Sequence, residues 1–130
     1  MKRKHIPLAL CALLLFAGCG ATAPQEPSYR QIDMAEAIAM MEAETGYIIL
    51  DVRTVEEFAA GHIPGAINIP NEAIGTEEIP ELPNKAQRIL VYCRSGNRSK
   101  QASEKLVALG YTNIVEFGGI ISWPGQIVTD

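Results

Sequence analysis

Cys93 is the residue of this sequence whose surroundings most clearly predict chemistry. It follows an apolar run of strand length at residues 88–92 and precedes a helical pattern at residues 99–109. A cysteine between a buried strand and a helix faces the amino terminus of that helix, where an anion is favoured. Because the thiolate and not the thiol is the nucleophile, this placement predicts a nucleophilic cysteine.

The loop after Cys93 is predicted to lower the pKa of the thiol further than a helix end alone can. A free cysteine has a pKa of about 8.5 and is only a few per cent ionised at neutral pH. A helix amino terminus contributes roughly 0.3 to 1 kcal/mol, less than one pKa unit at about 1.4 kcal/mol per unit. Gly96 permits the positive φ of a turn whose N–H groups converge on an anion, and Arg94 and Arg98 add two permanent positive charges. We therefore predict a lowered pKa for Cys93.

Apolar periodicity places this loop in an alternation of strands and helices. Asp33 and Thr54 each stand three residues before a glutamate, the spacing of a capping box at a helix start. An acidic stretch with two prolines, residues 71–85, predicts a solvated loop. The predicted strands are residues 47–50, 66–69, 88–92 and 114–117, and the predicted helices are residues 34–44, 54–60 and 99–109. This order predicts an α/β domain with a mainly parallel sheet, whose sites lie at the carboxyl ends of the strands.

Three further polar residues have both a chemical and a structural interpretation. Asp51 ends the strand at residues 47–50 and Arg53 follows it, so the two either shape the pocket or form a structural ion pair. His62 is either a general base or a structural histidine that hydrogen-bonds the neighbouring backbone. A thiolate activated by its own loop needs no base, which favours the structural interpretation of His62.

The first 28 residues predict export. A basic start at residues 2–4 precedes an apolar run at residues 6–17 that is too short to span a bilayer as a permanent helix. The run ends at Phe16-Ala17-Gly18-Cys19, which resembles the lipobox of bacterial lipoproteins, with an ordinary signal peptide or an uncleaved anchor as alternatives. We expect a signal peptide at 1–18, a tether at 19–28 and one domain at 29–130. The expected location is extracytoplasmic, in the periplasm or cell envelope, with a lipid anchor on Cys19.

Composition limits the partners of the mature chain. Removing residues 1–18 leaves 112 residues, enough for one domain, and lowers the Lys and Arg count from 11 to 8 against 15 Asp and Glu. The resulting net charge of −7 disfavours nucleic acid, and a monomer is the default expectation. Cys11 leaves with the signal and Cys19 is blocked by lipid, so Cys93 is the only free thiol. Such a thiol is either buried and inert or present for its reactivity, and the loop favours reactivity.

The loop itself resembles the active loop of the single-domain rhodanese sulfurtransferases. The resemblance covers about residues 29–123, and after Trp123 the chain departs from the pattern because the usual last helical turn is missing. The matching segments are Asp51-Val52-Arg53, Glu57-Phe58, Gly61-His62-Ile63-Pro64-Gly65-Ala66-Ile67-Asn68-Ile69-Pro70, Cys93-Arg94-Ser95-Gly96-Asn97-Arg98-Ser99 and Gly118-Gly119. The resemblance implies a five-stranded, mainly parallel sheet flanked by helices on both faces, with Cys93 at the base of a pocket.

The resemblance also implies the reaction. Attack of the Cys93 thiolate on the outer sulfur of thiosulfate, or on another persulfide donor, would leave a persulfide, which cyanide or a thiol then removes. Arg94 and Arg98 would attract the anionic donor, and no metal or organic cofactor is required. The residues implied to bind the donor and the persulfide are Arg94, Ser95, Gly96, Asn97, Arg98 and Ser99.

Other protein classes share parts of this pattern. Cysteine phosphatases use the same strand, anion loop and helix, but they place five residues between the cysteine and the arginine, whereas four separate Cys93 from Arg98. Arsenate reductases of this fold also have a longer loop. A rival of another class is a membrane-tethered binding module that uses the loop only as an anion or persulfide receptor, although such a module would not need an intact Cys93.

Overall fold

The structure is a computed structural model that describes residues 28–130. The predicted signal peptide and Cys19, with the tether up to residue 27, lie outside the described residues. The elements are β1 (Arg30–Gln31), α1 (Met34–Ala43), β2 (Ile48–Asp51), α2 (Val55–Ala60), β3 (Ile67–Asn68), the 3-10 turn η1 (Asn71–Ala73), β4 (Ile89–Cys93), α3 (Asn97–Ala108), β5 (Ile114–Gly119) and the 3-10 turn η2 (Ile120–Ser122).

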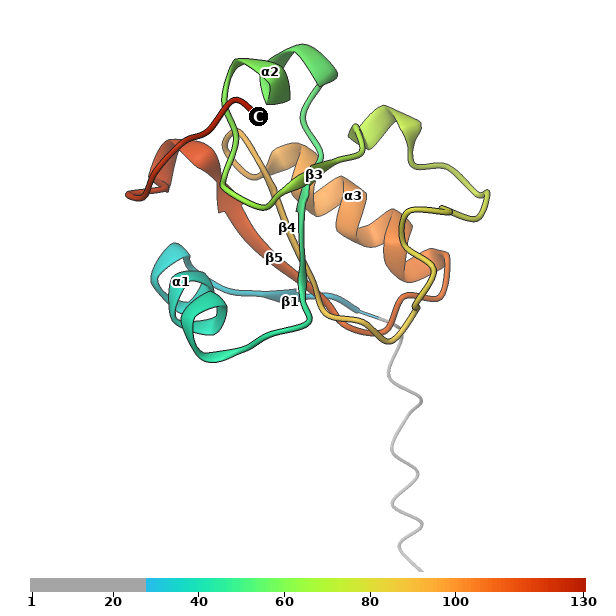
Figure 1. The fold of residues 1–130 in the computed structure, drawn as a ribbon. Helices are drawn as coiled ribbons and strands as arrows, with labels where there is room; N and C mark the ends of the chain where they lie inside the picture. Colours follow the sequence, from blue (N-terminus) through green and yellow to red (C-terminus); the bar gives the residue numbers. More distant parts are fainter. Residues whose placement is uncertain (1–27) are drawn as a thin grey trace, which may run out of the picture.

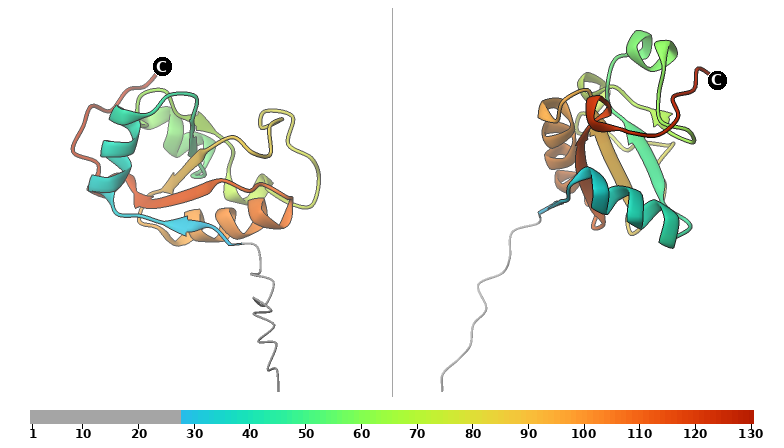
Figure 2. Two further views of the ribbon diagram at one scale, coloured as in Figure 1. Left: turned by 90° about the horizontal axis from the view of Figure 1, so that it is seen from below. Right: turned by 90° about the vertical axis from the view of Figure 1, so that its left-hand side faces the viewer.

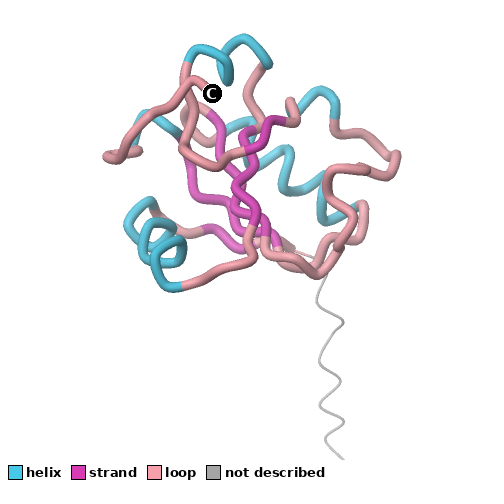
Figure 3. Tube along the Cα trace, viewed as in Figure 1, coloured by secondary structure: helices cyan, strands magenta, loops and turns pink. Residues whose placement is uncertain are grey.

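The five strands form one sheet in the order β1-β5-β4-β2-β3, and every neighbouring pair is parallel. Figures 1 and 2 show α1 and α3 on opposite sides of this sheet, and Figure 3 shows the strands crossing the centre of the molecule. The predicted α/β fold with a five-stranded sheet flanked by helices is therefore confirmed. β1 was not predicted, because Arg30 and Gln31 are polar and exposed and form no apolar run.

Side chains alternate between the two faces along each strand, so the domain has two apolar layers. On the α3 side, Leu50 and Val91 pack with Ala102 and Leu106, and Cys93 belongs to this layer. The opposite layer gathers around α1. Its buried members are Ile32, Ala37, Ile49, Ile63, Leu90, Tyr92, Val115 and Phe117. A central strand covered on both faces has no polar side, which explains why β4 is apolar throughout.

The capping residues fix where α1 and α2 begin. The Asp33 carboxylate accepts a hydrogen bond from Glu36 N–H at 2.8 Å, and Thr54 forms a complete capping box with Glu57. Both predicted N-caps are confirmed. The helix α3 begins at Asn97, two residues earlier than expected, because Gly96 turns the chain directly into the helix. The loop after Cys93 is therefore shorter than the sequence pattern indicated.

The acidic stretch between β3 and β4 is only partly solvated. Its glutamates are exposed, but Ile74, Ile79 and Leu82 are buried in the layer on the α3 side. No α-helix lies between β3 and β4, so these side chains cover the sheet where a helix would otherwise pack. The sequence pattern missed this because the three apolar residues follow no helical or strand period.

Candidate active site

Cys93 is the last residue of the central strand β4, at the carboxyl edge of the sheet. A shift in strand pairing after Val91 brings Cys93 opposite Gly119 of β5. The side chain is almost completely buried, with 1% of its surface exposed. Strand β4 thus delivers one sulfur atom to the point where the turn at residues 94–96 and the start of α3 meet.

The turn after Cys93 folds back so that its polar groups face the sulfur. Gly96 has a φ of 115° in the left-handed region, which a residue with a side chain rarely adopts. In this conformation Gly96 N–H donates a hydrogen bond to Cys93 Sγ at 3.0 Å. The Ser99 hydroxyl lies 3.4 Å from the same sulfur and is completely buried. The positive φ predicted for Gly96 is present in the structure, and the Gly96 N–H faces the sulfur.

The pKa of Cys93 lies below its ordinary value. Burial raises the pKa, but the hydrogen bond with the Ser99 side chain and those from the backbone N–H groups of Ser99, Gly96 and Ser95 lower it by more. The lowering comes from neutral dipoles. From the sequence we expected converging N–H groups, the helix start and the two arginines to lower the pKa together.

Gly118 and Gly119 hold the loop in place from β5. A Cβ atom added to Gly119 would lie 1.9 Å from the carbonyl oxygen of Arg94, so no other residue fits without displacing the loop. Ile121 N–H donates to the same carbonyl at 3.3 Å. Of the two glycines in the sequence pattern, Gly119 is therefore the one against whose backbone the cysteine loop packs.

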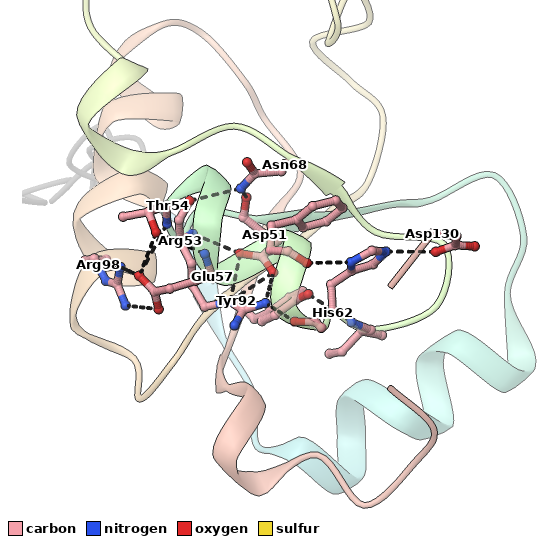
Figure 4. A network of polar contacts seen from close by, with 12 residues as sticks. Asp51, Arg53, Thr54, Glu57, His62, Asn68, Tyr92, Arg98 and Asp130 are labelled. Atoms are coloured by element: carbon pink, nitrogen blue, oxygen red, sulfur yellow. Dashed lines mark hydrogen bonds and ion pairs between the residues drawn. The ribbon is translucent and has the colours of Figure 1, made fainter. Parts of the chain in front are cut away.

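Arg98 and Arg94 have different surroundings. The Arg98 guanidinium makes two hydrogen bonds to the Glu57 carboxylate, at 2.6 and 3.1 Å, which joins α3 to α2 (Figure 4). This contact with Arg98 is the largest influence that lowers the pKa of Glu57, to about 2. Arg94 is exposed, as are Ser95 and Asn97. The positive charge of Arg98 is thus balanced by Glu57, a partner that the sequence analysis recognised only as a helix cap.

Asp51 and Arg53 form a buried ion pair. Arg53 Nη2 lies 2.7 Å from Asp51 Oδ2 and also donates to the carbonyl of Gly61 at 2.7 Å (Figure 4). The Asn68 side chain donates to the backbone carbonyls of both Asp51 and Arg53. This network ties the end of β2 to β3 and to the end of α2, as the structural interpretation of the pair expected.

His62 lies in the same network, with both ring nitrogens occupied. Its Nδ1 is 2.9 Å from the Phe58 carbonyl, and its Nε2 is 3.0 Å from the Asp130 carboxylate. The imidazole also stacks on the Phe58 ring, with the centroids 3.7 Å apart. This is the structural role expected for His62, and the Asp130 contact arises because the chain after Trp123 returns past α2 and pairs Val128 with His62.

Glu116 belongs to the site but was missed from the sequence. It lies on β5, is 3% exposed, and its Oε1 accepts hydrogen bonds from the Ser99 hydroxyl at 2.7 Å and from Gly118 N–H at 2.8 Å. The sequence did hold a signal, because a single acid inside the apolar run of residues 114–117 must have a buried polar partner. Ser99 is that partner, and it links Glu116 to Cys93.

Residues 28–130 contain neither a metal-binding cluster nor a membrane-spanning helix. Within residues 28–130, no three His, Cys, Asp or Glu side chains are grouped so that they could hold a metal ion. No helix in the same part of the chain has the length and apolar character needed to cross a bilayer.

Fold and site together define an α/β domain with a single cysteine in an anion-binding loop, and comparison with known proteins gives the family. The family model described as "Rhodanese-like domain" matches residues 33–124. The chain belongs to the rhodanese-like domain family.

Several relatives have about the length of this domain. The sulfurtransferase of Allochromatium vinosum is 38% identical over 91 residues, which cover 68% of this chain and 83% of the relative. The thiosulfate sulfurtransferase PspE of Escherichia coli is 38% identical over 71 residues, covering 55% and 68%. In contrast, the chain spans 24% of the adenylyltransferase and sulfurtransferase uba4 of Ogataea parapolymorpha. The single-domain relatives confirm the general prediction of a sulfurtransferase enzyme.

Solved structures agree with this assignment. A rhodanese-related protein from Thermoplasma volcanium matches with a TM-score of 0.65 and 32% identity, over 78% of this chain and all of the other. A structure described as rhodanese with anions, from E. coli, matches with a TM-score of 0.59 and 35% identity, over 65% of this chain and 99% of the other.

Proposed function

We propose that the protein carries sulfane sulfur as a persulfide on Cys93 and transfers it to a thiol or to cyanide. The observation that supports this most directly is the contact of Sγ with Gly96 N–H at 3.0 Å, in a loop whose N–H groups lower the thiol pKa. Nothing in this chemistry requires a cofactor. Cys93 is the nucleophile, and the site is built to hold it, and then the persulfide, as an anion.

The proposed first step is attack of the Cys93 thiolate on the outer sulfur of thiosulfate or of a comparable persulfide donor. The new bond joins Sγ to the outer sulfur, the S–S bond of thiosulfate breaks, and sulfite leaves with the bonding electron pair. In the second step the acceptor attacks the outer sulfur, and Cys93 leaves as the thiolate that began the cycle. No net oxidation or reduction of the protein occurs.

The loop has two tasks in this scheme. Its N–H groups, from Arg94 through Ser99, stabilise the negative charge of the thiolate and of the persulfide without neutralising it. The second task is to attract an anionic donor. We assign this mainly to Arg94, since Arg94 is exposed whereas Arg98 shares its charge with Glu57.

We further propose that the domain is held outside the cytoplasm by lipid on Cys19. Support for this comes from the sequence alone, from the basic start, the short apolar run and the segment Phe16-Ala17-Gly18-Cys19. Metabolic labelling with a tagged fatty acid tests it. The parent chain should take up the label and remain with the membrane fraction, and Cys19→Ser should do neither. Equal labelling of both would contradict the anchor.

Sulfur loading tests the reaction itself. The purified domain is incubated with thiosulfate, freed from the reagent and weighed intact. The parent should gain the mass of one sulfur atom and lose it again on treatment with cyanide, whereas Cys93→Ser should gain nothing. A binding module would show no gain. If the parent gains no sulfur, and Cys93→Ser and the parent transfer sulfur to cyanide at the same rate, the proposed sulfurtransferase activity of Cys93 is wrong.

A further inference from the structure

A carboxyl group is buried next to the nucleophile, and no cation balances it. Among residues 28–130, Glu116 forms no ion pair, and its carboxylate contacts the Ser99 hydroxyl and Gly118 N–H. Its side chain faces the cysteine loop, since a Cβ on Gly96 would lie 4.0 Å from Glu116 Oε1. The one other buried carboxylate of the described chain, that of Asp51, is paired with Arg53. Glu116 is therefore the exception that needs an explanation.

The Ser99 hydroxyl stands between Glu116 and Cys93 with more acceptors than it can serve. Its oxygen lies 2.7 Å from Glu116 Oε1, 2.9 Å from the Gly96 carbonyl and 3.4 Å from Cys93 Sγ. A hydroxyl has one proton to donate and two lone pairs that accept. When the proton points to Glu116, in the shortest of these contacts, Ser99 can only accept a hydrogen bond from the Cys93 thiol.

Ionising Cys93 changes what is required of Ser99. A thiolate has no proton to give, so Ser99 stabilises it only by turning its own proton toward Sγ. The Ser99 oxygen then presents a lone pair to Glu116 at 2.7 Å. A charged carboxylate at that distance is repelled, whereas a protonated carboxyl group donates to the Ser99 oxygen. The contact therefore favours a thiolate together with a neutral Glu116.

We propose that Glu116 receives, through Ser99, the proton that leaves Cys93, so that the two acids share one proton. The Sγ–H bond breaks and its proton passes to Ser99, while the Ser99 hydroxyl proton forms an O–H bond on Glu116. The charge moves from the carboxylate to the sulfur, and no proton enters or leaves the site. This inference rests on the proposed function, because it explains how the buried nucleophile is ionised.

The groups around the pair show why sharing is useful. Tyr29, next to β1, lies near both Glu104 and Glu116, and neither Tyr29 nor Glu104 supplies a positive charge. Arg98 is near enough for the charge of Cys93 to raise its pKa, but Glu57 already pairs with it. Arg94, the other cation of the loop, is exposed to solvent and lies outside the buried site, so a thiolate beside an ionised Glu116 would put two like charges in that site. Sharing the proton limits the site to one negative charge before an anionic donor arrives.

Infrared difference spectroscopy tests the proposal on the parent protein at neutral pH. Alkylation with iodoacetamide makes the sulfur a neutral thioether, so Glu116 must give up its proton. The carbonyl band of a protonated carboxyl group should disappear and a carboxylate band should appear. The same experiment on Glu116→Gln should show neither change. Glu104→Gln, which removes an exposed acid from α3, should behave like the parent. If the parent has a thiolate by ultraviolet absorbance but no such band, the proposal is wrong.

The pH dependence of alkylation gives a second readout. Two groups that share a proton titrate in two macroscopic steps, so the parent should show a two-step profile, and Glu116→Gln should show a single step. Ser99→Ala should lose the stabilisation by the hydroxyl and shift the first step to higher pH. A single step in the parent would overturn the proposal. Sulfur loading from thiosulfate is measured on the same samples, because a protein that loads without proton sharing disproves only this inference. A protein that shares the proton but does not load disproves only the proposed reaction.

Discussion

The carboxyl ends of β2 and β4 lie next to each other in the sheet, and each holds a buried acidic group. At the end of β2 the Asp51 carboxylate is paired with Arg53 at 2.7 Å, a full opposite charge. At the end of β4 the Cys93 sulfur is held by Gly96 N–H and the Ser99 hydroxyl, which are neutral dipoles.

The difference explains why one end is structural and the other is reactive. In an ion pair with two or more hydrogen bonds, each partner neutralises the charge and uses the hydrogen-bonding groups of the other, so neither is free to react. Neutral donors lower the free energy of the thiolate while leaving its lone pairs able to attack. The same sheet edge thus carries a structural ion pair at the end of β2 and a nucleophile at the end of β4. Each of the following experiments tests whether these two roles are separate.

Replacement of the nucleophile should have the largest effect on activity and almost none on folding. We expect Cys93→Ser to lower sulfur transfer to cyanide by roughly 10³-fold or more, as the loss of a covalent nucleophile does. The thermal unfolding midpoint should change little, since serine is nearly isosteric with cysteine. Retention of a tenth or more of the parent rate would show that another group accepts the sulfur.

Breaking the Asp51–Arg53 ion pair at the end of β2 should reduce stability strongly and leave the reactivity of Cys93 almost unchanged. Asp51→Ala leaves the buried Arg53 without its counter-charge, which should reduce the free energy of unfolding by about 3–5 kcal/mol in urea denaturation. The double variant Asp51→Leu with Arg53→Met removes both charges and should recover part of the loss. In conditions where Asp51→Ala is folded, its Cys93 should still be alkylated at the parent rate. A selective loss of Cys93 reactivity without loss of stability would make the pair part of the active site.

Displacing the loop should reduce activity with only a moderate loss of stability. In Gly119→Ala the new Cβ would collide with the Arg94 carbonyl, and a shift of the loop by about 1 Å costs on the order of 10²-fold in rate. The alkylation midpoint should move to higher pH because the N–H groups no longer face the sulfur. Gly75→Ala is the matched control, since its Cβ meets no atom within 4 Å. Equal rates of sulfur transfer in Gly119→Ala and Gly75→Ala would contradict the proposal that the close packing of Gly119 positions the cysteine loop.

The Arg98 and Glu57 contact should contribute stability that depends on pH. The pKa of Glu57 falls from 4.5 to about 2 on folding, so its contribution is complete above 4.5 and is lost as the pH falls toward 2. Acid titration of unfolding should show this loss in the parent and a smaller one in Glu57→Gln. Glu56→Gln, an exposed neighbour on α2, is the control and should follow the parent. Identical acid profiles for Glu57→Gln and the parent would show that the Arg98–Glu57 contact does not contribute to the stability of the domain.

The exposed arginine should have the smallest effect. Arg94→Gln should raise the KM for thiosulfate by about 2- to 5-fold at low ionic strength, with kcat nearly unchanged, because an exposed charge steers the donor but does not touch the reacting sulfur. High salt should abolish the difference, since it screens the exposed charge in the parent. A large fall in kcat would mean that Arg94 acts in the chemical step.

The sequence predicted most of the features that depend on local pattern. The strands β2 to β5, the three helices, both N-caps and the turn at Gly96 follow from periodicity, capping spacing and the need for a positive φ at one residue. What it could not predict depends on contacts between distant residues. Arg98 meets Glu57 across 41 positions, and Ser99 meets Glu116 across 17, so neither partner is visible from spacing along the chain.

The source of the anion-stabilising field was also assigned differently from sequence. From the sequence we expected the helix start, converging N–H groups and two arginines to lower the pKa of Cys93, whereas in the structure the largest lowering contacts are those of Ser99 and the backbone N–H groups. Backbone dipoles are present in every sequence, so only their orientation distinguishes this loop. That orientation is set by Gly96 and by the close contact of Gly119 with the Arg94 carbonyl.

The rate of Cys93 alkylation as a function of pH tests the central claim most directly. The account predicts that half of the maximal rate is reached at a pH below the value of about 8.5 for a free cysteine. The midpoint should return toward that value in Gly119→Ala. A midpoint at or above 8.5 in the parent would mean that the loop does not hold an ionised sulfur, and the account would be contradicted.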